Sequence, residues 1–410
     1  MNKLTMEVTM CGNTKTFERS RLYILILITV LYACILVSCS SNNGGTDSGR
    51  HGEALRFVFM ADSRSDSYGP EPVVPENFIN STVLTPIVKK ILDLRPRPSF
   101  VVFGGDMAYR GRYQHHSTSF YTFQAWKNVM KPLTDAGIPV YTAIGNHELY
   151  DTHGGTFSLA NQKEFQATFT DNPSNGPAGY ERLVYSFTSP KGDSFFAVLD
   201  PYYITADVPM SESESESLHG EIDDTQMNWL ADQLARTNAT HKFLFVHTPY
   251  YYMGGQPNPA PNGFVSFTNL WNMLDSNMFD LYACGHSHLY SRKTIDSSVA
   301  PDPQTNPPLP PWKNNVVQLL NGTCGAPLDA VAPVVDPSAW HVFNQLNKPD
   351  TYYFSVVDIN GSHTTVNSYG YNIDTTAFSI IDTFRIQKNT SPQIVAQRRK
   401  GEKLAKFIGR

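Results

Sequence analysis

The chain is poor in cysteine. Five cysteines occur in 410 residues, and two of them, Cys11 and Cys34, lie in the N-terminal leader segment described below. So few cysteines exclude a small fold that depends on a disulfide framework. For Cys284 and Cys324, two states stay open: a disulfide in an oxidising compartment, or two buried thiols.

An excess of positive charge is also missing. The formal net charge is −5 at pH 7, and a short basic stretch, QRRKGEKLAKFIGR, stands at the C-terminal end. A mildly acidic chain lacks the broad basic surface that nucleic acid binding requires. We therefore expect no nucleic-acid partner, and we interpret residues 389–410 as a solvated basic tail.

Long hydrophobic runs are scarce, and the run at residues 22–37, LYILILITVLYACILV, is too short for an ordinary spanning helix, which needs about 20 apolar residues. It follows Lys15, Arg19 and Arg21, an arrangement typical of a signal peptide. The run leads into LVSC, which resembles a bacterial lipobox and implies cleavage after residue 38 and a lipid on Cys39.

An uncleaved signal anchor is the alternative for this leader. Both interpretations predict export and attachment to a membrane at the bacterial cell envelope, on the periplasmic or surface side. Residues 39–53 are polar and rich in Ser, Asn and Gly, which predicts a flexible tether.

From residue 54 onward, apolar runs alternate with segments of helical spacing. ALRFVFMA and SFVVFGGD have the composition of buried strands, and STVLTPIVKKILDL has apolar residues at helical intervals. Alternating strands and helices predict an α/β architecture. No boundary divides residues 54–388, so we expect one domain there.

Several of the predicted strands end in residues of the types that bind metals. The segments are RFVFMAD, VVFGGDMAY, TAIGNHE, FLFVHT and LYACGHSH. Each alone is ordinary, because an Asp after a strand commonly forms a turn or caps a helix. Together they place three histidines, two aspartates and an asparagine at strand ends, where α/β proteins build their sites, and this indicates a metal site.

The order of these motifs, D…GD…GNH[ED]…H…GHxH, resembles that of the calcineurin-like metallophosphoesterases. It runs through Asp62, Asp106, the Asn146–Glu148 segment, His247 and the His286–His288 segment, and covers roughly residues 54–292. The resemblance implies an α/β fold of the four-layer α/β/β/α sandwich type, the metallo-dependent phosphatase fold. It also implies a hydrolase that cleaves phosphate esters with two metal ions.

One departure refines the resemblance. The commonest pattern in the family is Asp-x-His, but Arg64 stands two residues after Asp62. The purple acid phosphatase branch also lacks this histidine and has a tyrosine three residues after the second aspartate. Tyr109 stands at that position after Asp106, so the chain is most similar to small purple acid phosphatases.

The resemblance implies a ligand set for each metal. Metal one would take Asp62, Tyr109 and His288, metal two would take Asn146, His247 and His286, and Asp106 would bridge them. The hard anionic donors of the first set favour Fe(III), and Asn with two imidazoles suits a divalent ion, Zn, Fe(II) or Mn.

Three further residues receive roles. The resemblance places His147 at the phosphate and leaving group, for transition-state stabilisation or general acid catalysis, with Glu148 as its orienting partner. Arg64 offers two parallel donors to a phosphate, and an ion pair with Asp66 is the alternative.

The sequence thus predicts an exported, membrane-tethered phosphatase with a phosphate-ester substrate, most similar to a monoesterase. HTPYYYMGG follows the fourth motif with tyrosines where that branch often has a substrate-binding histidine, so the substrate contacts stay open. A phosphodiesterase or nucleotidase is the alternative within the family, and a non-catalytic metal-binding surface lipoprotein is the alternative outside it.

Overall fold

The computed structural model describes most of the chain beyond the leader. The described residues are 54–67, 73–115, 118–151, 156–209, 220–250, 261–297, 312–329, 344–346 and 350–388. The chain divides into two units, residues 1–51 and 52–410, and every described residue lies in the second. The predicted signal peptide, Cys39, the tether and the basic tail lie outside the described residues. Within the described part, no helix is long and apolar enough to cross a bilayer.

One sheet has six strands in the order β17-β16-β15-β1-β2-β5. Its members are β1 (Leu55–Met60), β2 (Phe100–Phe103), β5 (Val140–Thr142), β15 (Thr351–Asn360), β16 (His363–Asn372) and β17 (Ala377–Gln387). β1, β2 and β5 run parallel, whereas β15 pairs with β1 in the antiparallel direction and leads into a hairpin meander. The carboxyl ends of β1, β2 and β5 therefore lie at one edge of this sheet.

The other large sheet has seven strands in the order β14-β12-β13-β11-β10-β8-β7. Its members are β7 (Tyr185–Thr188), β8 (Ser194–Val198), β10 (His241–Phe245), β11 (Leu281–Cys284), β12 (Tyr290–Ile295), β13 (Val316–Asn321) and β14 (Asn344–Leu346). β8, β10, β11 and β13 are parallel, so their carboxyl ends also share one edge.

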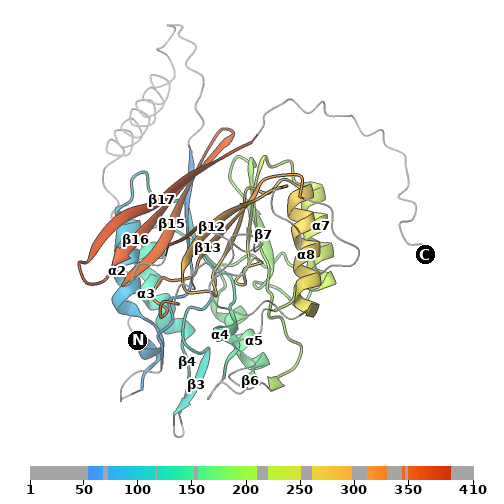
Figure 1. Cartoon of the computed structure of the whole chain (residues 1–410). Coiled ribbons are helices and arrows are strands. Elements are labelled where there is room, and N and C mark those ends of the chain that lie inside the picture. The colour runs from blue at the N-terminus through green and yellow to red at the C-terminus, as the bar shows by residue number, and fades with distance from the viewer. Residues whose placement is uncertain are drawn as a thin grey trace, which may run out of the picture. The chain divides into compact units, whose positions relative to one another are not determined.

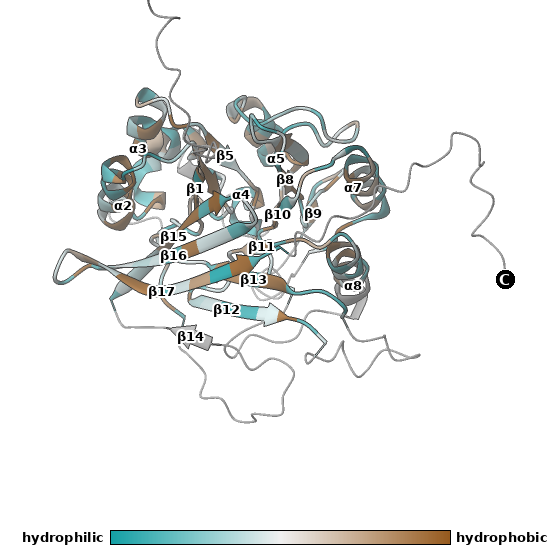
Figure 2. Ribbon diagram, turned by 90° about the horizontal axis from the view of Figure 1, so that it is seen from above, coloured by the Kyte–Doolittle hydropathy of each residue, from teal (hydrophilic) through white to brown (hydrophobic). Residues whose placement is uncertain are grey.

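Helices flank both sheets, and two short strand pairs complete the described elements. The helices are η1 (Pro75–Phe78), α2 (Ser81–Asp93), α3 (Phe123–Asp135), α4 (Asn146–Leu149), α5 (Leu159–Thr168), α7 (Asp224–Arg236) and α8 (Pro261–Ser276). The short pairs are β3 (Arg112–His115) with β4 (Thr118–Tyr121), and β6 (Thr156–Phe157) with β9 (Val208–Pro209). α2 and α3 lie beside the six-stranded sheet, and α7 and α8 lie beside the seven-stranded sheet (Figures 1 and 2).

Side chains alternate between two cores along the central strands. Phe57 of β1 and Phe243 of β10 belong to the core between the sheets, where their rings lie 5.3 Å apart. The neighbouring Val58 packs toward the core that includes α2, and Leu244 packs toward the core that includes α8. Each fully buried side chain of this kind stabilises the fold by about 1.5–3 kcal/mol. The layers are helix, sheet, sheet, helix, so the predicted α/β/β/α sandwich is confirmed (Figure 2).

The two cysteines of the described part are free thiols. Cys284 and Cys324 are both buried and unpaired with each other. The Sγ atom of Cys284 lies 3.6 Å from the Leu319 carbonyl, and that of Cys324 lies 3.2 Å from the Tyr353 carbonyl. Of the two states left open by the sequence, the structure has the buried thiols.

Candidate metal centre

Strand ends supply six of the seven predicted metal ligands. These residues follow β1, β2, β5, β10 and β11 at the ends where the chain leaves the sheet. They are Asp62, Asp106, Asn146, His247, His286 and His288. The two sheets therefore bring these side chains to one place, as the strand-end pattern predicts.

The ligand atoms form two groups that share one residue. In the first, one atom from each of Asp62, Asp106 and His288 lies within 4.8 Å of the others. In the second, the same holds for Asp106, His247 and His286. We call these groups the first and second positions. A carboxylate that belongs to both is the arrangement needed to bridge two cations.

Three of these residues have an unusual backbone conformation. Asp62, Asp106 and His286 have φ angles of 58°, 54° and 72°, in the left-handed region. This conformation costs a non-glycine residue about 1–3 kcal/mol, and such residues gather at functional sites. The strand ends are bent so that these side chains turn into the site.

Backbone N–H groups fix the two carboxylates. The N–H of His286 donates to Asp62 Oδ1 and Oδ2 at 3.1 and 3.2 Å, and the N–H of His147 donates to Asp106 Oδ1 at 3.0 Å. Gly145 leaves the necessary room, because a Cβ there would lie 2.2 Å from Asp106 Oδ1. The GNHE motif therefore needs a glycine at its first position, because the Asp106 side chain of the GGD motif occupies the space of a Cβ.

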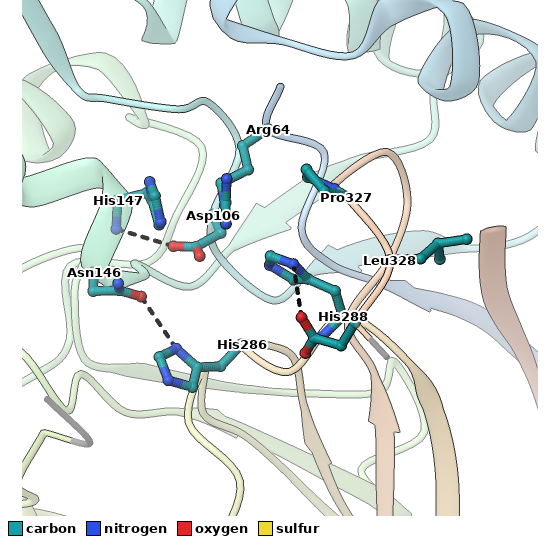
Figure 3. A pocket seen from close by; sticks show the side chains of 9 residues that line it. Arg64, Asp106, Asn146, His147, His286, His288, Pro327 and Leu328 are labelled. Atoms are coloured by element: carbon teal, nitrogen blue, oxygen red, sulfur yellow. Dashed lines mark hydrogen bonds and ion pairs between the residues drawn. The ribbon is translucent and has the colours of Figure 1, made fainter. Parts of the chain in front are cut away.

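The second position contains a buried nitrogen that suits a metal ion. His247 Nδ1 bonds the Gly104 carbonyl at 2.8 Å, which assigns the Nδ1 proton and directs Nε2 to the site. His247 Nε2 is buried without a hydrogen bond, although Asp106 Oδ2 lies 3.3 Å away. The amide oxygen of Asn146 lies 3.2 Å from His286 Nδ1 (Figure 3). Imidazole, carboxylate and amide donors around such a nitrogen fit a divalent cation.

Burial and charge separate the proton affinities of the site residues. Burial raises the pKa of Asp62 well above its usual value, and the charge of Asp106 adds to this effect. For Asp106, burial is outweighed by His247 and His147, which hold its pKa well below the usual value. Burial also opposes protonation of His247, but Asp106 and Asp62 raise its pKa to about 9. A metal ion at His247 Nε2 must displace that proton, so metal affinity increases with pH.

The site opens into a cavity of about 260 Å³. Its lining residues are Arg64, Asp106, Asn146, His147, His286, His288, Pro327, Leu328 and Asp329 (Figure 3). Arg64 donates from Nη1 to the Ser65 carbonyl at 3.2 Å, and within the described residues it forms no ion pair. The alternative of an ion pair with Asp66 does not occur there, and the guanidinium stands at the cavity instead.

His147 also lines the cavity, and its ring is oriented by the backbone. Its Nδ1 lies 2.7 Å from the Tyr109 carbonyl, so Nδ1 is the donor and Nε2 is the atom that gains or loses a proton. Burial and the charge of Arg64 lower the pKa of His147 to about 3. The free imidazole is therefore neutral, and a bound anion is needed to stabilise its protonated form.

Glu148 has a different role from the predicted one. Its carboxylate accepts hydrogen bonds from the N–H groups of Asp106, Met107 and Gly145 at 2.8, 2.7 and 2.7 Å. It therefore joins the GGD and GNHE turns, whereas a backbone carbonyl orients the His147 ring. Burial raises the pKa of Glu148 to about 7, although the N–H donors act in the opposite direction.

Tyr109 stands beside the site and is half-buried. Its ring centroid lies 5.8 Å from that of His147 and 6.5 Å from that of Phe78. The Arg110 guanidinium stacks over the ring at 4.8 Å, and Arg64 lies at 6.0 Å. Tyr109 is outside the set of described residues that line the cavity, so its part in metal binding stays a prediction.

Sequence reasoning missed Asp329, which lines the cavity beside His288. It lies eight residues beyond the end of β13 at Asn321, so no strand-end pattern includes it. An acidic residue in a loop rich in Gly and Pro is ordinary, and its position is visible only after folding.

A four-layer sandwich with two acid–histidine groups at its strand ends is the arrangement expected of the calcineurin-like phosphoesterases. The chain matches the family model of the Calcineurin-like phosphoesterases over residues 56–290, which is more than half of its length. It belongs to that family. None of the curated proteins compared with the chain matches it.

The solved structures that the chain resembles are distant from it in sequence. The purple acid phosphatase PPD1 from yellow lupin (Lupinus luteus) seeds is 16% identical with a TM-score of 0.53, over 82% of this chain and 54% of that chain. This chain therefore spans about half the length of the lupin enzyme. GAP50, described as the anchor in the inner membrane complex of Plasmodium, is 15% identical with a TM-score of 0.46, over 82% and 89%. A putative 5′-nucleotidase from Staphylococcus aureus is 13% identical with a TM-score of 0.36, over 82% and 54%.

Proposed function

We propose that the protein hydrolyses phosphate monoesters at this cavity with two metal ions bound, one at each position. The sharing of Asp106 between two acid–histidine groups is the observation that carries the proposal. A bound metal pair supplies positive charge for the phosphoryl oxygens and activates water for attack. The remaining chemistry falls to residues of the chain.

The donor sets suggest which metals bind. The first position would take Asp62, Asp106 and His288, with Tyr109 completing it. Carboxylates and a phenolate are hard anionic donors, which favours Fe(III). At the second position, the ligands would be Asp106, Asn146, His247 and His286. The imidazoles of this set suit Zn, Fe(II) or Mn.

Arg64 binds the phosphate in this proposal. Its guanidinium lines the cavity, lacks a carboxylate partner among the described residues and presents several N–H donors in one plane. A monoester carries more negative charge than a diester, so the Arg64 guanidinium beside the cavity favours the monoester.

His147 moves the proton. A phosphate in the cavity would offset the charge of Arg64, which lowers the pKa of His147, and would thereby favour a proton at Nε2. That proton passes to the oxygen of the leaving group as the P–O bond breaks. Glu148 keeps the Asp106 and Gly145 turns together while this occurs.

We also propose that the enzyme works outside the cytoplasm, attached to a membrane through a lipid on Cys39 or through an uncleaved anchor. The charged residues before the apolar run at 22–37 and the LVSC sequence at the end of this run support this proposal. Mass spectrometry of the N-terminus would test it, because a lipid on Cys39 predicts a first mature residue at that position.

One assay tests the catalytic proposal. The purified full-length chain is incubated with aryl phosphate monoesters and diesters, and its metal content is measured alongside. We expect two metals per chain and faster hydrolysis of the monoester. Faster hydrolysis of the diester would replace the proposal with a phosphodiesterase, and two metals without hydrolysis of any ester would replace it with a metal-binding protein.

A further inference from the structure

The loop after β13 links two residues of the first position, Asp62 and His288. We call residues 323–329, TCGAPLD, the clasp. At its start, the N–H of Cys324 donates to the carbonyls of Ala61 and Asp62 at 2.8 and 3.0 Å, and the N–H of Ala326 donates to the Asp62 carbonyl at 2.9 Å. Three hydrogen bonds therefore hold the peptide groups around Asp62, where the backbone is in its left-handed conformation.

The other end of the clasp holds His288. The N–H of His288 donates to Asp329 Oδ2 at 2.7 Å, and the N–H of Asp329 donates to the His288 carbonyl at 3.0 Å. This reciprocal pair fixes the backbone of both residues. Because a backbone N–H bonded to a carboxylate is a charge-assisted donor, it is stronger than an ordinary loop contact.

The ring of His288 stands between two carboxylates. Its Nδ1 lies 3.7 Å from Asp329 Oδ1, and its Nε2 lies 3.6 Å from Asp62 Oδ1. Both separations exceed hydrogen-bond length, so the carboxylates act on the ring electrostatically. With a cation at the first position to offset the charge of Asp62, the Asp329 carboxylate would favour the tautomer with its proton on Nδ1, which leaves the Nε2 lone pair directed at the first position.

We propose that Asp329 is a positioning residue for His288 and sets the metal affinity of the first position. The inference rests on the proposed two-metal centre. Histidines that bind metals commonly present their other ring nitrogen to a carboxylate, which fixes the tautomer and the ring orientation. The Asp329 carboxylate lies on that side of the His288 ring, 3.7 Å from Nδ1, and also anchors the backbone that carries the ring.

The second position is held by other contacts. His247 is oriented by the Gly104 carbonyl, and the Asn146 amide donates to the Tyr150 hydroxyl at 3.2 Å. The N–H of His286 donates to Asp62 rather than to the clasp. Loss of Asp329 should therefore weaken one metal position and spare the other, which a general loss of stability would not do.

The test is a titration of the metal-free full-length chain with Zn²⁺ alone. Isothermal titration calorimetry measures the number of ions bound and the affinity of each position. Wild type should bind two ions. Asp329→Ala should weaken one of the two by roughly 10–100-fold and leave the other unchanged. Asp329→Asn keeps an oxygen for the His288 N–H but loses the charge beside Nδ1, so its affinity should fall between those of wild type and Asp329→Ala.

Asp275→Asn is the matched control. Asp275 is also a buried aspartate, and it accepts the backbone N–H groups of Lys313 and Asn314. This variant should bind both ions as wild type does. Thermal unfolding of each metal-free variant checks that the fold persists.

Two results would overturn the assignment of Asp329 and leave the proposed metal centre standing. In the first, Asp329→Ala binds Zn²⁺ at both positions with wild-type affinity. In the second, Asp329→Ala weakens both positions equally. A wild-type chain that binds no Zn²⁺ at all would instead overturn the proposed metal centre, and the assignment of Asp329 with it.

Discussion

The backbone N–H of His286 faces both oxygens of the Asp62 carboxylate, at 3.1 and 3.2 Å. Asp62 follows β1 of the six-stranded sheet and His286 follows β11 of the seven-stranded sheet. The contact therefore joins the two sheets at their carboxyl ends. It needs Gly285 before His286, because a Cβ at Gly285 would lie 2.2 Å from Asp62 Oδ2.

Gly285→Ala should displace the Asp62 carboxylate and impair the first position. Overpacking a buried site costs about 1–3 kcal/mol, and here the displaced atoms are the proposed metal ligands. We expect loss of one bound metal, measured by metal analysis, together with a lower unfolding temperature. Gly137→Ala is the control: its Cβ would meet nothing within 4 Å, so strain at φ 76° should lower stability while both metals stay bound.

Tyr109→Phe should remove a visible absorption band if Tyr109 binds Fe(III). A phenolate on ferric iron absorbs visible light by charge transfer, whereas a phenylalanine ring leaves no such ligand. The absorption spectrum is recorded with iron content measured in parallel. Tyr113→Phe, which alters another tyrosine ring packed near Phe78, should keep the band. An unchanged spectrum in Tyr109→Phe with full iron content would disprove the ligand assignment.

Arg64→Gln should weaken binding of inorganic phosphate. Hydrogen bonds to charged groups contribute about 1.5–3 kcal/mol, which corresponds to a rise in the inhibition constant of roughly tenfold to a hundredfold. Competitive inhibition by phosphate measures the effect, and metal content should be unchanged. Arg236→Gln, at the end of α7, removes an exposed charge away from the cavity and should have no effect. Equal inhibition constants for wild type and Arg64→Gln would exclude Arg64 from the phosphate site.

His147→Ala should reduce turnover by about 10²–10⁴-fold while both metals remain bound. His147 donates through Nδ1 to the Tyr109 carbonyl, so Nε2 is the nitrogen left to protonate the leaving oxygen. An alkyl leaving group needs that proton more than an aryl one. The loss should therefore be larger for an alkyl phosphate than for p-nitrophenyl phosphate. Equal losses for the two esters would contradict the role as an acid.

The clustering of acidic and histidine side chains at the strand ends was predictable from the sequence because the pattern is local. An apolar run that ends in Asp62, or in Asp106 after two glycines, combines a buried strand with a metal-ligating residue within a few positions. Glu148 shows the limit of this reasoning. Its neighbour His147 was the expected partner, but adjacent residues on a helical turn point in different directions, and its carboxylate meets other loops.

Helix α5 shows a related limit of prediction from the sequence. It lacks a regular apolar stripe, because its buried face includes Asn161 and Gln162. The Asn161 amide donates to the Leu149 and Tyr150 carbonyls, and the Gln162 amide donates to the Ile204 carbonyl. Polar side chains that bond the backbone of distant loops give no periodic signal. Such contacts, like those of the clasp, depend on tertiary structure.

A buried cluster of His241, Asp280 and Lys388, separate from the metal centre, predicts how stability depends on pH. His241 lies 3.0 Å from Asp280 Oδ1 through Nδ1 and 2.8 Å from the Gly361 carbonyl through Nε2. Lys388 lies 3.1 Å from Asp280 Oδ2, and the Lys242 N–H donates to the same oxygen. With an acceptor at each ring nitrogen, His241 is most stable when doubly protonated.

The sign of the effect follows from the direction of the shift. Burial opposes the charge, but the hydrogen bond and charge of Asp280 raise the pKa of His241 above that of an unfolded histidine, while Lys388 acts against it. The folded state therefore binds this proton more tightly. The stabilisation of the folded state by this proton is fully present below the unfolded pKa of about 6.5 and is lost as the pH rises through the folded pKa.

His241→Gln should lose this part of the pH dependence of the unfolding free energy, measured by urea denaturation. His363→Gln removes a histidine bonded to the Ser362 hydroxyl and should keep the wild-type profile. If wild type and His241→Gln showed the same dependence on pH, His241 would not be the group that titrates.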